Sequence, residues 1–171
     1  MYERILVPLD GSEFAEAVLR HVRALAECTG AEIILLRVVV YPPAIYPVPY
    51  EYPILDPVLA AAVREKEEVV RLEVRDYLQY IAASLEEAGL SVLIEVRDEP
   101  VVDAILDVAE SLRADLIAMS THGDSGTVHR FIGAVADRVV HNAKVPVLLI
   151  RPALTDPAFS SHIVDVMVID W

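Results

Sequence analysis

The stretch DLIAMSTHGDSGTVHRFIGAVADRVVHNAKVPVLLIR, residues 115–151, decides the fold class of this chain. It holds three of the six glycines, Gly123, Gly126 and Gly133. An apolar run stops at a cluster of small residues, and a helical pattern begins after the second glycine, which predicts a strand, a tight turn and a helix N-terminus. Such a junction gathers unpaired N–H groups and the positive end of a helix dipole, so it can hold a phosphate without a lysine. A glycine serves a plain turn equally well, and the spacing alone leaves both interpretations open.

Strands and helices alternate along the rest of the chain. The expected strands are 4–10, 32–40, 91–96, 115–119 and 145–150, and the expected helices are 12–30, 58–88, 101–112 and 131–142. Because a helix separates each strand from the next, the pattern predicts an α/β fold, a doubly wound parallel sheet with right-handed crossovers and helices on both faces. The length of 171 residues fits one domain with a sizeable core.

Asp10 is the first candidate for a ligand contact. It stands at the carboxyl end of the first expected strand, where open α/β sheets place their ligands. It also precedes Gly11 and Ser12, and aspartate is a common turn former. The local chemistry is therefore compatible with either role.

The stretch around Gly123 resembles the nucleotide-binding signature of the universal stress protein family. In that signature, two glycines flank two residues, and nine residues then lead to a third glycine followed by serine or threonine. Gly123 and Gly133 stand at the second and third glycines, with the nine residues Asp124–Ile132 between them. Ser120 replaces the first glycine, and Ala134 replaces the hydroxyl residue. The loss of one neutral hydrogen bond to phosphate costs about 0.5–1.5 kcal/mol, which weakens such a site without abolishing it.

The resemblance implies a five-stranded parallel sheet in the order 3-2-1-4-5, a Rossmann-like fold of the adenine nucleotide α-hydrolase type. It places the ligand crevice between the first and fourth strands and implies a dimeric stress-response protein that binds ATP or AMP, with or without Mg²⁺. The nucleotide-binding residues that it implies are Pro8, Asp10, Val38, Met119, Ser120, His122, Gly123, Arg130, Gly133, Ala134 and Val135.

The family assigns these positions different parts of the nucleotide. The resemblance implies that Asp10 contacts the nucleotide near ribose and adenine, that the main chain of Val38 meets adenine and that Met119 packs near the same base. Backbone N–H groups of Gly123, Gly133, Ala134 and Val135 would contact ribose and phosphate. His122 and His129, which flank the loop, are expected as hydrogen-bonding or phosphate neighbours rather than general bases.

Composition excludes several function classes. The net charge of −13, with 27 acidic and 14 basic residues, opposes nucleic-acid binding, which needs a basic surface. No signal peptide and no apolar run of membrane-spanning length is evident, so a cytoplasmic protein is expected that does not bind membranes. The lone Cys28 is expected to pack as a small hydrophobe in a reducing compartment.

Catalytic patterns are also missing from the sequence. It contains neither a lysine-bearing phosphate loop nor a Ser-His-Asp order, so no dedicated enzyme is expected, with slow ATP hydrolysis at most. A receiver-type phosphoacceptor domain is disfavoured because Pro8 stands where a second acidic residue would accompany Asp10.

Two segments lie outside this core pattern. Tyr41–Pro57 contains six of the eleven prolines and four of the seven tyrosines and is expected to be a lid or a packed insertion. Residues 1–152 are expected to form the stress protein domain and 153–171 a C-terminal extension. The strand Val145–Ile150 would form an edge through which two copies dimerise, unless the tail covers it. The alternative function is a nucleotide-free interaction protein that recruits partners through the Tyr/Pro loop and the tail.

Overall fold

The computed structural model describes residues 2–41, 57–121 and 132–151, with the side chains of 57–59 left aside. The elements are β1 (Arg4–Pro8), α1 (Glu13–Glu16), α2 (Leu19–Thr29), β2 (Glu32–Val38), α3 (Pro57–Glu87), β3 (Val92–Arg97), α4 (Val101–Ser111), β4 (Leu116–Ser120), α5 (Ala134–Asn142) and β5 (Val147–Ile150).

The five strands form one sheet in the order β3-β2-β1-β4-β5, and all four pairings are parallel. The predicted fold class and strand order are therefore confirmed. The chain moves outward from β1 to β2 and β3, returns through α4 to β4 beside β1, and continues to β5. The crossovers on the two sides of the β1–β4 pair thus leave in opposite directions, and open α/β sheets bind their ligands at the carboxyl ends of the strands at such a point.

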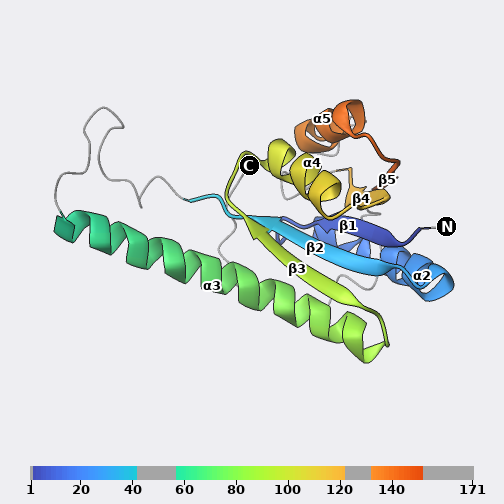
Figure 1. Ribbon diagram of the computed structural model, residues 1–171, viewed down its shortest axis with the longest axis horizontal. Coiled ribbons are helices and arrows are strands. Elements are labelled where there is room, and N and C mark those ends of the chain that lie inside the picture. The colour runs from blue at the N-terminus through green and yellow to red at the C-terminus, as the bar shows by residue number, and fades with distance from the viewer. Residues whose placement is uncertain (1, 42–56, 122–131, 152–171) are drawn as a thin grey trace.

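Helices cover both faces of the sheet, with α4 and α5 on one and α2 and α3 on the other (Figure 1). The face covered by α1, α2 and α3 is called the α1–α3 face, and on it Ile5, Ile33 and Leu35 pack with Leu78 of α3. Alternate strand residues point to the other face, where the second apolar cluster lies. It includes Leu6, Ile34, Ile105, Ile117 and Val139. The inner strands are buried on both faces, which explains why their sequences are nearly continuous apolar runs.

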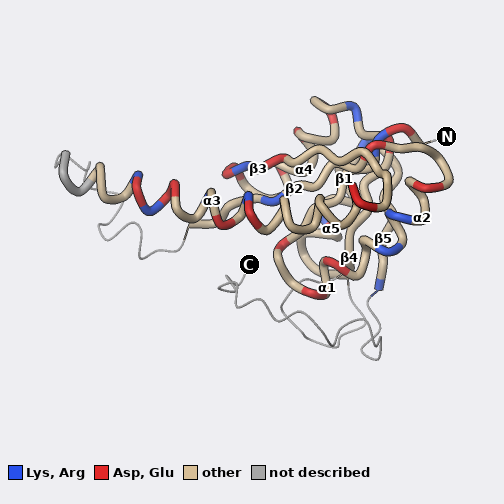
Figure 2. The backbone as a smooth tube through the Cα atoms, turned by 90° about the horizontal axis from the view of Figure 1, so that it is seen from below, with Lys and Arg blue, Asp and Glu red and all other residues tan. Residues whose placement is uncertain are grey.

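The long helix α3 has 31 residues, and its N-terminal part extends past the carboxyl edge of the sheet (Figure 1). Acidic and basic positions alternate along it (Figure 2). The charged side chains of 64–68, with Arg71 and Glu73, are mostly exposed. Arg71 bonds outside its own helix, however: its guanidinium pairs with Asp98 after β3, and its Nε donates to the hydroxyl of Tyr41 at 3.0 Å.

Several predicted boundaries need correction. The single helix expected over 12–30 is divided into α1 and α2. At the division, two hydrogen bonds span three residues instead of four: Val18 N to Ala15 O at 3.4 Å and His21 N to Val18 O at 3.0 Å. Most other ends differ by one or two residues, as frayed helix and strand ends do. The observed bounds 32–38, 57–87, 92–97, 101–111, 116–120 and 147–150 replace the expected 32–40, 58–88, 91–96, 101–112, 115–119 and 145–150.

The prediction that Cys28 packs as a small hydrophobe is wrong, because its side chain is exposed. The buried positions of α2 are Val22 and Ala26, four residues apart on one face. Cys28 follows Ala26 by two residues and so points to the far side of the helix. The predictions for the Tyr/Pro loop and for the 153–171 extension fall mainly or wholly outside the described residues.

Candidate functional site

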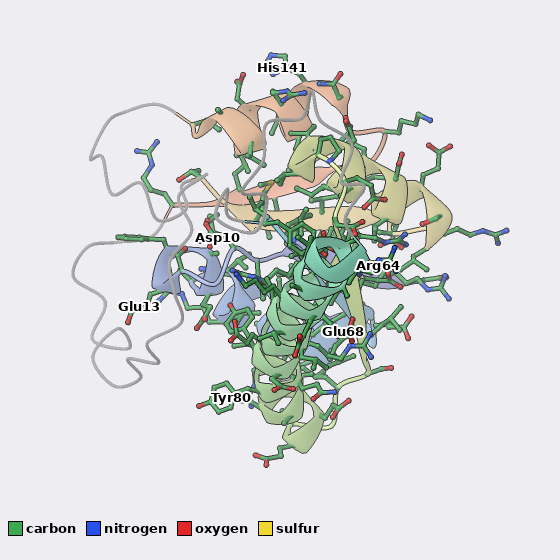
Figure 3. The ribbon with its side chains drawn as sticks, turned by 90° about the vertical axis from the view of Figure 1, so that its left-hand side faces the viewer. Asp10, Glu13, Arg64, Glu68, Tyr80 and His141 are labelled. Carbon is green, nitrogen blue, oxygen red and sulfur yellow. The ribbon has the colours of Figure 1, made fainter. Side chains whose placement is uncertain are left out.

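The predicted ligand contacts that the structure describes gather at the carboxyl edge of the sheet. Pro8 ends β1, Val38 ends β2 and Ser120 ends β4. Asp10 follows β1 in the turn before α1, and Figure 3, which faces this edge, shows it near the centre of the molecule. Because β1 lies between β2 and β4, these residues line one continuous edge.

The carboxylate of Asp10 is held by the turn that it forms. Its Oδ1 accepts hydrogen bonds from Ser12 N at 2.9 Å and from Ser12 Oγ at 2.6 Å. The same Ser12 hydroxyl oxygen accepts from Ala15 N at 3.1 Å and so caps α1. Asp10 therefore acts as a turn former, and this role fixes the direction of its carboxylate at the edge of the sheet. The carboxylate thus stands at the edge of the sheet where the ligand contact was predicted.

A polar cluster lies beneath this turn, within the core of the α1–α3 face. The guanidinium of Arg37, from β2, stacks on the ring of Tyr77, from α3, at 5.3 Å from the ring centroid. The Tyr77 hydroxyl donates to Glu16 Oε1 at 2.9 Å. Burial lowers the pKa of Arg37, and Tyr77, Asp10 and Glu16 oppose that shift. Burial, reinforced by Glu16, raises the pKa of Tyr77 above its usual range.

The β4 side of the edge is built differently. Met119 and Ser120 are buried, with 7% and 8% exposure. Met119 belongs to the apolar cluster of the α4–α5 face. Thr121 N donates to Ile150 O of β5 at 2.8 Å, and Thr121 O accepts from Gly133 N at 2.7 Å. This last bond holds the start of α5 directly against the end of β4.

Helix α5 begins at Ala134, whereas the sequence pattern predicted a start at Phe131. Gly133 is extended, with φ −60° and ψ 153°, and serves as the N-cap. Ala134 and Val135 are therefore the first two helical residues, whose N–H groups have no acceptor within the helix. The N–H of Gly133 is engaged with Thr121, so the donors that this helix start can offer a ligand are those that follow it.

Three predicted site residues, His122, Gly123 and Arg130, lie outside the described residues, as does His129. Within the described ranges, no group of three His, Cys, Asp or Glu side chains is arranged to hold a metal ion. No helix in the same ranges is long and apolar enough to cross a membrane.

The sequence patterns did not identify Arg37, Tyr77 and Glu16 as members of the site. One signal was available: Arg37 is the single basic residue within the apolar run EIILLRVVV. A charged group inside a strand that is buried on both faces needs partners in the core.

The chain matches the model of the Universal stress protein family over residues 1–151. Universal stress protein MJ0531 of Methanocaldococcus jannaschii is 28% identical to it over 88% of this chain and 83% of the relative. The solved structure of MJ0577 from the same organism is 27% identical, with a TM-score of 0.72, over 91% of this chain and 99% of that one. A family protein of Arabidopsis thaliana, solved with AMP bound, has a TM-score of 0.62 at 17% identity over 91% and 98% of the two chains. This chain therefore belongs to the universal stress protein family.

Proposed function

We propose that this stress protein binds an adenine nucleotide, ATP or AMP, in the crevice between the carboxyl ends of β1 and β4. The observation that carries the proposal is the hydrogen bond from Gly133 N to Thr121 O. It sets the N-terminus of α5 at the end of β4, and β4 is paired with β1, which leads to Asp10.

The two sides of this crevice suit the two ends of a nucleotide. The carboxylate of Asp10 accepts hydrogen bonds, as ribose hydroxyls require. The N–H groups of Ala134 and Val135, with the helix dipole behind them, favour a phosphate. Apolar Val38 ends β2, and apolar Met119 is the last residue but one of β4, so an adenine ring at this edge would find apolar contacts on both sides of β1. An acidic protein can hold a small anion in this way, because the donors are main-chain groups.

The ligand class is also supported by the Arabidopsis protein of this fold, which was solved with AMP bound. Its 17% identity supports the shared fold alone, so the adenine nucleotide remains our proposal for this chain. Occupancy of the site would act as a regulatory signal in the cytoplasm, with slow hydrolysis at most.

Native mass spectrometry of the protein as purified, followed by thermal-shift titration with ATP and AMP, tests the proposal. A ligand that binds only the folded state at one hundred times its Kd stabilises that state by about 2.7 kcal/mol, so a clear rise in Tm is expected. GTP is the matched control for the base. A protein that carries no nucleotide and shows a flat Tm to millimolar ATP and AMP would refute nucleotide binding.

A second function, recruitment of a protein partner without nucleotide, is favoured by one observation. Val69, Leu72 and Tyr80 on α3 are 49%, 51% and 58% exposed, which is unusual for large apolar side chains on one helix. Tyr80 projects away from the body of the molecule in Figure 3. The nucleotide titration separates the two functions, because only the first predicts a shift in Tm.

We also propose that the protein is a homodimer joined through the strand that ends at Ile150. β5 lies at one edge of the sheet, and its four residues VLLI are only half-buried. An open apolar edge of this kind favours pairing with a second copy around a two-fold axis. Leu148→Lys would place a charge in that contact.

Light scattering at micromolar concentration should give a dimer mass for the wild type and a monomer mass for Leu148→Lys. Leu93→Lys, on the opposite edge strand β3, is the matched control and should remain a dimer. A monomer mass for the wild-type chain would refute the dimer.

A further inference from the structure

The side chain of Arg37 lies under the Asp10 turn rather than in the solvent. On β2, Leu35 faces the α1–α3 cluster and Leu36 the opposite one. Alternation along a strand places Arg37 on the same face as Leu35, and its stacking on Tyr77 of α3 agrees with this. The guanidinium is thus enclosed between the sheet and the helices that follow the turn.

Gly11, the residue after Asp10, is in close contact with this guanidinium. A Cβ at Gly11 would lie 3.0 Å from both Cζ and Nη2 of Arg37 and closer still to Nη1. Gly11 also has a φ of +83°, which disfavours any other residue. The main chain of the turn therefore rests on the guanidinium, and a side chain at Gly11 would separate them.

Electrostatics ties the same group to the turn. Asp10 and Glu16 both interact favourably with the positive charge of Arg37. Nη1 of Arg37 is buried and has no hydrogen-bond partner among the described residues. Because this nitrogen is closed off from solvent, a ligand at the edge of the sheet cannot reach it directly. A contact between this group and a ligand must therefore pass through the residues that cover it.

The position of the guanidinium is itself determined by α3 and α1. The ring of Tyr77 supports the guanidinium, and the Tyr77 hydroxyl is held by Glu16 at 2.9 Å. Glu16 ends α1, which begins immediately after the Ser12 cap. The turn, α1, β2 and α3 are therefore joined around one buried charge.

We propose that Arg37 is a positioning residue of the ligand site: it holds the Asp10 turn from beneath and thereby fixes the direction of the Asp10 carboxylate. This role rests on the proposed nucleotide site for its functional consequence. Its structural part, the order of the turn, exists without any ligand and can be measured separately.

The ligand-free test is amide hydrogen exchange by NMR on the full chain. Ser12 N–H donates to Asp10 Oδ1, so its exchange rate reports the order of the turn. In Arg37→Met, which removes the guanidinium and keeps an unbranched apolar chain, exchange at Ser12 should be about tenfold faster, as expected for a local opening. Exchange at Leu35 in β2 should stay within about twofold of the wild type, because the sheet itself is not opened.

Arg37→Lys retains the positive charge and should restore most of the protection at Ser12. The matched control is Arg23→Met, which removes an equal charge from an exposed i,i+4 pair with Glu27 and should leave Ser12 unchanged. Equal acceleration at Ser12 and Leu35 in Arg37→Met would show a general stabilising role, and wild-type exchange at Ser12 would show no role. Either result overturns the proposal.

The functional test is a double-mutant cycle by calorimetry with ATP as the probe. Arg37→Met should weaken binding about fivefold to tenfold when Asp10 is present, and have almost no effect in the Asp10→Ala background, because the effect passes through the Asp10 side chain. Equal losses in both backgrounds would mean that Arg37 acts on the ligand independently of Asp10 and would overturn the proposal. If the wild type binds no ATP, the proposed function fails, while the exchange measurement still decides the role of Arg37.

Discussion

The two walls of the proposed crevice are built from different chemical groups. On the β1 side, the geometry depends on side chains: the Asp10 carboxylate, the Ser12 hydroxyl and the Arg37 guanidinium beneath them. On the β4 side it depends on the main chain, through the Gly133 to Thr121 hydrogen bond and the start of α5. A wall made of main-chain groups tolerates changes of small side chains, which explains how Ser120 and Ala134 can depart from the family signature without loss of the architecture.

The largest effect is expected from Gly11→Ala, which adds a single methyl group to the β1 side of the site. Gly11→Ala should lower the free energy of unfolding by about 3 kcal/mol, because it combines a positive φ with a clash against the buried guanidinium. Gly30→Ala is the matched control: its φ is +76°, but no atom of the described residues lies within 4 Å of the added carbon. It should cost about 1 kcal/mol, the conformational part alone. If urea denaturation gives equal losses of unfolding free energy for the two variants, the guanidinium can move away from the added methyl group at little cost, which would contradict a tightly held turn.

A medium effect concerns Tyr77, which supports the same wall. Its raised pKa means that the folded protein keeps the hydroxyl proton at a pH where the unfolded chain, with a tyrosine pKa of about 10, has lost it. This contribution to stability is therefore constant below pH 10 and decreases above it, by up to about 1.4 kcal/mol per pH unit.

Urea denaturation of wild type and Tyr77→Phe between pH 8 and 11 measures this contribution. The wild type should be more stable by about 1 kcal/mol at pH 8, where the bond to Glu16 is intact, and should lose that advantage by about pH 11. Tyr80→Phe, on the exposed side of the same helix, is the control and should be nearly neutral. An advantage that stays constant to pH 11 would contradict the buried, protonated state of Tyr77.

The smallest expected effect concerns the β4 side of the site and is measured as a change in nucleotide affinity. Ala134→Ser adds a hydroxyl at the first residue of α5 and should tighten ATP binding by up to about tenfold, the equivalent of one added hydrogen bond. AMP should gain less, because the hydroxyl addresses the outer phosphates. Ser120→Gly, which restores the other departure, should change ATP affinity by less than about twofold, since serine already supplies the same main-chain groups. Equal gains for ATP and AMP in calorimetry would show that Ala134 faces another part of the ligand.

The parallel α/β sheet was accessible from local sequence patterns, whereas its strand order was implied by the resemblance to the family. Apolar runs that stop near Asp10 and at Ser120 indicate where β1 and β4 end, and alternation with helices indicates that the strands are parallel. The polar cluster was not accessible in the same way. Glu16 and Tyr77 are 61 residues apart and meet only through packing of α3 on the sheet. A lone arginine in an apolar strand indicated a buried charge, but not which side chains would surround it.

The helix boundaries show the same limit at shorter range. The apolar spacing of the sequence does not reveal the division between α1 and α2. The i→i−3 hydrogen bonds of Val18 and His21 alter the helix so little that this spacing stays nearly helical. The late start of α5 is hidden for another reason. It depends on the bond between Gly133 and Thr121, a contact across the loop that no periodicity records.

The bond from Gly133 to Thr121 also has an evolutionary consequence. This bond joins Thr121 and Gly133, the residues on either side of segment 122–132, so the two ends of that segment are held together by residues outside it. Doubling the length of a closed loop costs only about 0.6 kcal/mol in entropy. Selection can therefore lengthen, shorten or rewrite the sequence between these two anchors while β4 and α5 stay in place. A change in the length of this one segment should therefore cost far less stability than a change in the sheet that carries it.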